Sequence, residues 1–581
     1  MRFLRRALRR LRSNRIWLVH HAGYAQTIPR IPLDPERGER IAAFLREERV
    51  VGRRAIVRPQ PASLREILRV HAADYVASLD RTDIVSQAVG VPLTDAERQR
   101  AVDHQRLVTG GTIQAVALAL DTGLPAVNLS GGLHHATPAR GMGFCLINDV
   151  AIAIANARAR GFSGRVLVVD LDLHDGNGTR AAFADDATVH TFSIHNQDWE
   201  PEGGVATTSL ALGTGVSDAV LLETLRSSLP PIVEQHRPSL VIYVAGTDPA
   251  GDDRLGDWDM TATGLLERDQ FVIDTVRDRV PRSSLVVVLA GGYGRQTWRY
   301  SARFLGWLAG GRAIEPPDDL ELTLRRYRRT ALPRESPDGW GLTEEDLFAI
   351  VPGAGPGTRV LGAFSRHAIE VSLEEVGILD QLRALGYAEP SVEIAFGTGA
   401  GELIRVFGDQ ERTLLLLELR VTRNRRVISG MEVVYVEWLL LQDPRREFTA
   451  MQPRLPGQTH PGLGMLREVV AWTVLLGERL KLDGLAFAPS QYYMAVLGRH
   501  HLQLLDPVAA ARFAALQKTL AGLPLDQAEA ALAAGRVVDS ATGQPVGWEP
   551  GVAVYPISEQ LRTRLRAMPV GELGVRYVLR P

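Results

Sequence analysis

The chain has 581 residues and a mass of 63.6 kDa, more than one hydrophobic core usually serves, so several domains are expected. Its 66 basic and 67 acidic side chains leave a net charge of −1, which excludes a protein that attracts nucleic acid through an overall positive charge. Apolar residues make up 45% of the chain and the single cysteine, Cys145, cannot form an internal disulfide, which excludes a mainly disordered protein and a secreted disulfide framework.

The first predicted element is a basic amphipathic segment at residues 1–15. In MRFLRRALRRLR the apolar side chains fall on one helical face and arginines fill the other. Such a helix can lie on an anionic membrane surface, dock on its own protein or fray. No stretch approaches the roughly 18 apolar residues that a spanning helix needs. We expect a cytoplasmic protein, with peripheral membrane contact through this segment as the alternative.

Residues 16–312 alternate short apolar runs with helical stretches, which is typical of an α/β domain with a parallel sheet. Four runs are short, apolar and followed by glycine or charge, so each is predicted as a buried strand. These runs are Ala126–Leu129, Val166–Val169, Leu240–Ala245 and Leu285–Leu289. The predicted fold class is α/β, with a doubly wound and mostly parallel sheet.

A proline- and charge-rich segment at residues 313–340 predicts a linker. Beyond it, residues 341–581 are expected to form a second, α+β domain. Its predicted strands include Leu414–Val421 and Met431–Leu441, and a long helical pattern follows at Leu466–Leu480. The oligomeric state is not predicted from the sequence.

Polar and reactive side chains follow all four predicted strands of the first domain. Because ligands bind outside the carboxyl ends of the strands in open α/β sheets, these side chains are expected to converge at one edge. In chain order they are His134, His135, Asp170, Asp172, His174, Asn177, Asp248 and Tyr293.

Three of these side chains form a candidate metal site. Asp172 and His174 lie two residues apart on an extended segment, so both project to the same side. With Asp248 they supply two carboxylates and one imidazole, a set suited to Zn²⁺ with an open position for water. A solvated strand end explains Asp-x-Asp-x-His equally well when the motif is taken alone. Convergence with the histidine pair and with Tyr293 favours the metal site.

Longer segments surround these residues: LSGGLHHATPARGMGFCLINDV, VLVVDLDLHDGNGTRAAF, AGTDPAGDDRLG and LAGGYG. They resemble successive blocks of the histone deacetylase / acetylpolyamine amidohydrolase family, which has an arginase/deacetylase-like fold. The DRLG sequel to Asp248, the TGGT segment at Thr109–Thr112 and the GLLERDQFV helix most resemble the class IV branch. The resemblance covers most of residues 16–308.

The resemblance implies a role for each residue at the strand ends. Asp172, His174 and Asp248 would bind Zn²⁺, with Fe²⁺ as the alternative metal. His135 would be the general base on the metal-bound water and later the acid toward the leaving amine. Tyr293 would hydrogen-bond the carbonyl oxygen as it becomes an oxyanion.

The resemblance also implies how the base is supported. His134 would be the electrostatic partner of the base, held by Asp170. Asn177 stands where other branches carry a second aspartate, so it would orient the imidazole of His135 without adding negative charge. Family members often also hold a monovalent cation, here K⁺, which would engage Asp170 and the backbone near His174 and Ser193.

The substrate tunnel for an acyl-lysine side chain would include Gly143, Phe144 and Leu255. The opposite wall falls in NQDWEPEGG, which departs from the family pattern, so either Trp199 or Glu200 stands there. The acyl specificity of the site is open at this point.

The resemblance implies a zinc-dependent hydrolase that removes acyl groups from lysine of a protein or peptide, long-chain fatty acyl groups as well as or rather than acetyl. No nucleic-acid partner is expected. The alternatives are acetylpolyamine deacylation and a non-catalytic scaffold that binds acyl groups or CoA. PGQTHPGLGM at Pro456–Met465 faintly resembles the CoA-binding loop of a GNAT-type acyltransferase, although an ordinary turn before a core helix is the simpler interpretation.

Overall fold

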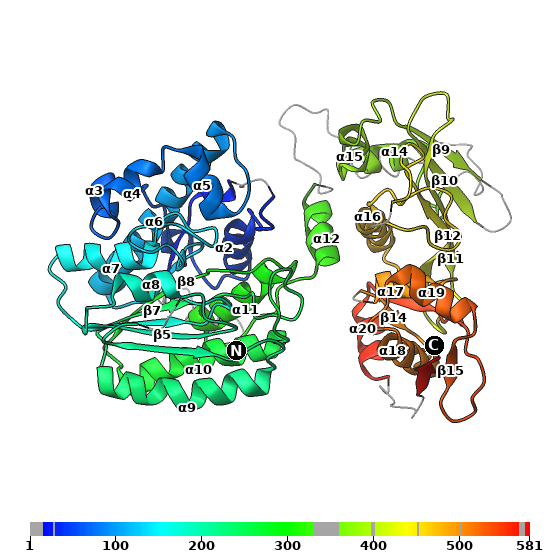
Figure 1. Cartoon of the computed structure of the whole chain (residues 1–581). Coiled ribbons are helices and arrows are strands. Elements are labelled where there is room, and N and C mark those ends of the chain that lie inside the picture. Colours follow the sequence, from blue (N-terminus) through cyan, green and yellow to red (C-terminus); the bar gives the residue numbers. More distant parts are fainter. Residues whose placement is uncertain are drawn as a thin grey trace, which may run out of the picture. The chain divides into compact units, whose positions relative to one another are not determined.

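The chain divides into two compact units, Met1–Pro316 and Pro317–Pro581 (Figure 1). The predicted N-terminal segment, residues 1–15, lies outside the described residues, as do residues 331–340 of the predicted linker. No helix of the described part is long and apolar enough to cross a membrane. The computed structural model describes residues 16–26, 30–200, 203–330, 359–396, 401–449, 452–499, 501–568 and 576–580.

The first unit is built on an eight-stranded sheet in the order β2-β1-β3-β8-β7-β4-β5-β6. Every neighbouring pair is parallel, which confirms the predicted α/β class. The four predicted strands are β3, β4, β7 and β8, and the other four were not predicted. The bounds are β1 Trp17–Val19, β2 Ile56–Val57, β3 Ala126–Asn128, β4 Val166–Asp170, β5 Val189–His195, β6 Thr207–Ala211, β7 Leu240–Val244 and β8 Ser284–Val288.

Helices cover both faces of this sheet, and every residue of β4 and β7 is buried. On one face α6 and α7 pack against the strands, and Figure 1 shows α9 and α10 on the opposite side. On that side the ring of Tyr243 on β7 meets Phe304 of α11, and its hydroxyl binds Asp269 of α10. The longer helices are α2 Arg37–Glu47, α6 Asp95–Thr122, α7 Asp149–Ala159, α9 Asp218–His236, α10 Ala262–Arg279 and α11 Thr297–Gly310.

The strand register brings the functional segments to one edge. Asp170 at the end of β4 pairs with Val244 at the end of β7, and Val244 pairs with Val288 at the end of β8. Val288 pairs in turn with Asn128 at the end of β3. The four loops that follow these strands therefore start side by side at the carboxyl edge of the sheet.

The second unit contains a seven-stranded mixed sheet in the order β14-β16-β13-β12-β11-β10-β9. Its β12 and β13 are parallel, with α16 (Leu466–Arg479) between them in the chain, and the other pairs are antiparallel. This mixed sheet agrees with the predicted α+β class. The bounds are β9 Ser391–Ala395, β10 Glu402–Phe407, β11 Leu415–Asn424, β12 Val433–Leu441, β13 Gly484–Phe487, β14 Gln503–Leu504 and β16 Ala553–Pro556.

Part of the predicted linker is a helix of the second unit, α12 (Asp319–Thr330). Its Leu320, Leu324 and Tyr327 are buried in the core of that unit. These three positions recur at helical spacing, whereas most of the other residues of the helix are charged. Some of these pair on the helix surface, as Arg325 does with Glu321. The charged composition that suggested a linker therefore belongs to the outer face of an amphipathic helix.

Candidate active site

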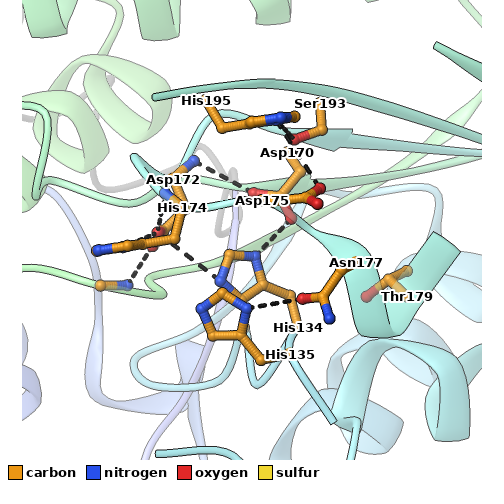
Figure 2. A network of polar contacts seen from close by, with 12 residues as sticks. His134, His135, Asp170, Asp172, His174, Asp175, Asn177, Thr179, Ser193 and His195 are labelled. Atoms are coloured by element: carbon orange, nitrogen blue, oxygen red, sulfur yellow. Dashed lines mark hydrogen bonds and ion pairs between the residues drawn. The ribbon is translucent and has the colours of Figure 1, made fainter. Parts of the chain in front are cut away.

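Asp172, His174 and Asp248 lie together at the carboxyl edge of the first unit's sheet (Figure 2 labels the first two). The first two follow β4 and Asp248 follows β7. His174 Nδ1 is 3.2 Å from Asp172 Oδ1 and 3.0 Å from Asp248 Oδ2. Both carboxylates are buried. One imidazole nitrogen and two carboxylates thus face a common point.

Backbone amides and close glycines fix both carboxylates. Gly291 N–H donates to Asp172 Oδ2 at 2.7 Å, and Leu173 N–H donates to Asp248 Oδ1 at 3.1 Å. A Cβ on Gly291 would lie 2.4 Å from Asp248 Oδ2 and 2.6 Å from Asp172 Oδ2. Only glycine fits there, so the loop after β8 closes directly over the acids.

This donor set fits a divalent cation. Burial and the neighbouring Asp172 carboxylate raise the pKa of Asp248, because two buried negative charges repel each other. A bound cation removes that repulsion. Carboxylate oxygens and imidazole nitrogens bind zinc, and three protein ligands with a fourth position left for water or substrate is the pattern of catalytic zinc sites.

The adjacent histidines His134 and His135 lie beside this site with different groups behind them (Figure 2). His134 Nδ1 is 2.7 Å from Asp170 Oδ2, and His135 Nδ1 is 2.9 Å from Asn177 Oδ1. Their ring centroids are 4.1 Å apart. Asn177 begins α8 (Asn177–Ala182), directly after the metal-site segment.

These partners separate the two pKa values. Burial lowers the pKa of His134, but the charges of Asp170 and Asp172 outweigh it and raise the value to about 9. Burial and the charged His134 lower the pKa of His135 well below its usual range. His135 is therefore neutral at neutral pH. With its Nδ1–H donating to Asn177 Oδ1, its Nε2 is a free base.

Tyr293 follows β8 through a glycine-rich turn. Its ring centroid lies 6.1 Å from that of Phe144, edge to face. Burial and the charges of Asp248 and Asp172 raise the pKa of the Tyr293 phenol well above its usual value. The hydroxyl therefore keeps its proton and can donate a hydrogen bond to developing negative charge.

Of the two residues considered for the far tunnel wall, Trp199 lies against the site. Its indole stacks on the His135 imidazole, with centroids 4.1 Å apart and planes 1° apart. A Cβ on Gly143 would lie 2.3 Å from His135 Cδ2 and 3.0 Å from Trp199 Cζ3, so this wall is tightly closed. Glu200 instead forms an ion pair with Arg140.

Leu255, the remaining predicted tunnel residue, follows Asp248 in the chain and is 43% exposed. Phe144 has a left-handed backbone, with φ at 66°, which is uncommon for a bulky residue. Gln105 of α6 holds this backbone, since its Nε2–H donates to Phe144 O at 2.6 Å. The structure thus places Phe144 beside Tyr293, and Leu255 in the loop after a metal-site carboxylate.

Two further residues, Asp175 and Arg37, support the site. Asp175 accepts both Arg180 Nη1 and Nη2, at 2.6 and 2.8 Å, and also the Trp199 N–H at 3.1 Å. It thereby fixes the backbone of Trp199. Arg37 is buried and donates to Leu289 O and Ala290 O, at 3.0 and 2.9 Å. The contacts of both residues depend on the folded structure, and no periodicity in the sequence specifies them.

Asp175 also lies with His195 and Asp198 in a second group of titratable side chains. Arg180 already neutralises the Asp175 carboxylate in a buried, bidentate ion pair. His195 Nε2 lies 3.0 Å from Asp198 Oδ1, and Nδ1 lies 2.8 Å from Ser193 Oγ. This group is therefore internally satisfied, with an arginine on its buried carboxylate.

Comparison with known proteins places the first unit in a family. Residues 31–305 match the histone deacetylase domain family. Histone deacetylase 2 of Arabidopsis thaliana is 32% identical over 281 residues, which are 47% of this chain and 72% of that protein. An uncharacterized protein of Picosynechococcus is 35% identical over 285 residues, 48% of this chain and 92% of the relative.

The acetoin utilization protein AcuC of Staphylococcus aureus is 30% identical over 269 residues, 43% of this chain and 68% of that protein. The crystal structure of an HDAC homolog from Aquifex aeolicus is 24% identical, with a TM-score of 0.45, and the alignment covers 53% of this chain and 87% of that one. Through residues 31–305, the chain belongs to the histone deacetylase domain family.

Proposed function

We propose that the first unit is a metal-dependent amidohydrolase that removes acyl groups from Nε-acyl-lysine of a protein or peptide. The observation that carries this proposal is the convergence of Asp172, His174 and Asp248 beside a neutral, oriented His135. Membership of the histone deacetylase domain family supports the same reaction class.

The chemistry that a bound Zn²⁺ or Fe²⁺ supplies is Lewis-acid polarisation of the amide carbonyl and of a water molecule. His135 Nε2 takes a proton from the attacking water and later delivers it to the leaving amine. His134, charged through Asp170, stabilises the negative charge that develops beside it. Tyr293 donates its hydroxyl proton as a hydrogen bond to the carbonyl oxygen.

Trp199 excludes water from one face of the base, because its indole lies flat against the His135 ring. Its Nε1 is buried and has no hydrogen-bond partner among the described residues. Together with Gly143 and Phe144, Trp199 would form the walls around the lysine side chain. The K⁺ ion expected near Asp170 and Ser193, which face each other across β4 and β5, stays a prediction.

The acyl preference that we favour is long-chain, as well as or rather than acetyl. It rests on the likeness of three segments to the class IV branch. Acetylpolyamine substrates are less favoured, because Leu255 offers no carboxylate to pair with a substrate ammonium at this point of the expected tunnel.

Steady-state rates on lysine peptides carrying C2 to C16 acyl groups, measured beside acetylspermidine, test the proposal. We expect turnover on the peptides, rising with chain length and abolished by a chelator. Faster turnover of acetylspermidine would assign the polyamine alternative. The absence of turnover on any acyl-lysine by metal-loaded protein would contradict the proposal.

A CoA-binding role of the second unit is the second candidate. β12 pairs with β13 only as far as Tyr435, so Val436–Leu441 of β12 extend past the paired part of β13. Gly462 and Gly464 lie just before the start of α16. Glu468 lies in the first turn of α16, and its negative charge would repel an anion bound at this end of the helix. Calorimetric titration of the full chain with CoA tests this role. Saturable binding supports it, and no binding overturns it.

A further inference from the structure

The turn that carries Tyr293 has little conformational restraint of its own. Gly291, Gly292 and Gly294 surround the tyrosine, and both Ala290 and Gly292 have positive φ, at 48° and 140°. Glycine lets a backbone adopt such conformations but also leaves it many others. Other groups must therefore hold the turn if the phenol is to stay in one place.

The first half of the turn is held from two sides. Arg37 Nη1 donates to Ala290 O and Gly291 O, at 2.9 and 3.3 Å. Thr247 N–H donates to Gly291 O at 3.0 Å. None of these contacts reaches the backbone of Tyr293 itself.

The second half is held by Asp253. Its Oδ2 accepts the N–H groups of Tyr293 and Gly294, at 2.6 and 3.0 Å. Its Oδ1 accepts the N–H groups of Leu255 and Gly256, at 2.9 and 3.0 Å. One carboxylate thus receives four backbone hydrogen bonds from two loops.

These two loops carry different parts of the proposed site. Asp253 lies in the loop after β7, five positions beyond the metal-site residue Asp248, whereas Tyr293 lies in the loop after β8. Hydrogen bonds to an ionised carboxylate are about twice as strong as neutral ones. The carboxylate therefore ties the position of the tyrosine to the loop that begins at Asp248.

We infer that Asp253 is a positioning residue that fixes the Tyr293 hydroxyl relative to the metal site. The inference rests on the proposed function, in which that hydroxyl stabilises an oxyanion. A hydrogen-bond donor helps only where it meets the developing charge, and a displacement of about 1 Å costs on the order of 10²-fold in rate. Without Asp253 the amides of Tyr293 and Gly294 lose the carboxylate that holds them.

Asp253→Ala tests the inference, with Asp252→Ala as the matched control. Asp252 accepts the Tyr300 hydroxyl at 2.6 Å and binds neither amide of the turn. We expect Asp253→Ala to lower kcat by roughly 10–100-fold with KM changed less than about twofold. Asp253→Asn keeps one carbonyl oxygen and should fall between. Asp252→Ala should stay within about twofold of wild type.

A double-mutant cycle separates positioning from general damage. In a Tyr293→Phe background, Asp253→Ala should cost less than about twofold, because the group it positions is gone. An equal loss in both backgrounds would overturn the inference. Metal content measured on each variant shows whether the Asp248 loop is intact, and Asp253→Ala should retain wild-type metal content.

Amide hydrogen exchange over residues 290–296 gives a readout that does not depend on activity. Exchange should be faster in Asp253→Ala and unchanged in Asp252→Ala. Unchanged exchange in Asp253→Ala would overturn the inference whether or not the chain is active. A wild-type chain without turnover would overturn the proposed function, and the catalytic part of this inference with it.

Discussion

Two neighbouring imidazoles, His134 and His135, have different charge states, because Asp170 supports the charge of His134 while burial and that charge keep His135 neutral. Asp170 keeps His134 protonated, whereas the neutral amide of Asn177 only orients His135. The lower pKa of His135 keeps the proposed base free of a proton down to acidic pH. The expectation from the sequence, that an amide leaves this base less basic than a carboxylate would, stays a prediction.

Asn177→Asp should move the acid limb of the pH profile. A carboxylate behind His135 raises its pKa, because it stabilises the imidazolium. Since the base acts only when neutral, kcat/KM should then fall at a higher pH than in wild type. Profiles of kcat/KM from about pH 4.5 to 9 measure this shift. An acid limb that does not move would contradict the assignment of His135 as the base.

Tyr293→Phe should slow turnover by roughly 10²–10³-fold, because removing one oxyanion donor costs on the order of 3–4 kcal/mol. The loss should fall on kcat rather than on KM, since the hydrogen bond strengthens only as charge develops. Tyr300→Phe is the control, because the Tyr300 phenol binds Asp252 outside the proposed site. A Tyr293→Phe variant with unaltered kcat would remove this tyrosine from the reaction.

At the level of elements, the sequence predicted β3, β4, β7 and β8 of the first sheet and β11 and β12 of the second, but missed β9 and β10. β4 and β7 are buried on both faces, so their apolar runs stand out. β9 and β10 carry Glu393 and Arg405, whose ion pair lies on one face of the sheet and interrupts the apolar pattern. A short strand is recognisable in a sequence when it is both buried and continuously apolar. β5 is buried at six of its seven positions, but His190, Thr191 and Ser193 interrupt its apolar run, and it was missed.

The same distinction holds in the candidate site. The metal-site acids and the histidine pair directly follow predicted strands, so topology alone placed them at one edge. The stacking of Trp199 on His135 and the four contacts of Asp253 depend on loop conformation. No periodicity in the sequence specifies such contacts.

Helix α12 is expected to stabilise the second unit. Leu324 is fully buried in that unit's core, so Leu324→Ala should lower its free energy of unfolding by about 2–5 kcal/mol. Arg325→Ala, on the partly exposed face of the same helix, is the control and should change stability little. Urea unfolding monitors the loss, while deacylase activity should be retained. Equal stability of both variants would contradict the packing of this helix.

For the whole molecule, a half-buried histidine at the start of β5, His190, and a buried one at the end of α9, His236, predict acid sensitivity. Burial and the charge of His236 lower the pKa of His190 to about 4, and burial lowers that of His236. Above about pH 6.5 both are neutral in the folded and unfolded states and contribute no pH dependence. Between about pH 6.5 and 4 the unfolded chain binds protons that the folded chain does not, so stability falls as the pH is lowered.

Urea midpoints at about pH 7 and pH 5 measure this effect, with His190→Gln as the comparison. The wild-type midpoint should be lower at the acidic pH. The variant should lose less between the two values, because one of the two titrating groups is gone. An equal pH dependence in both proteins would assign the acid sensitivity to other groups.

Metal stoichiometry measured together with turnover tests the account most directly. Wild type and Asp198→Ala, a change in the second group of titratable residues, should each bind about one divalent cation per chain and hydrolyse acyl-lysine. Asp248→Ala should lose both the cation and turnover, and chelation of wild type should abolish activity until Zn²⁺ or Fe²⁺ is restored. An Asp248→Ala variant that keeps its cation, or wild-type turnover that survives complete metal removal, would contradict the account.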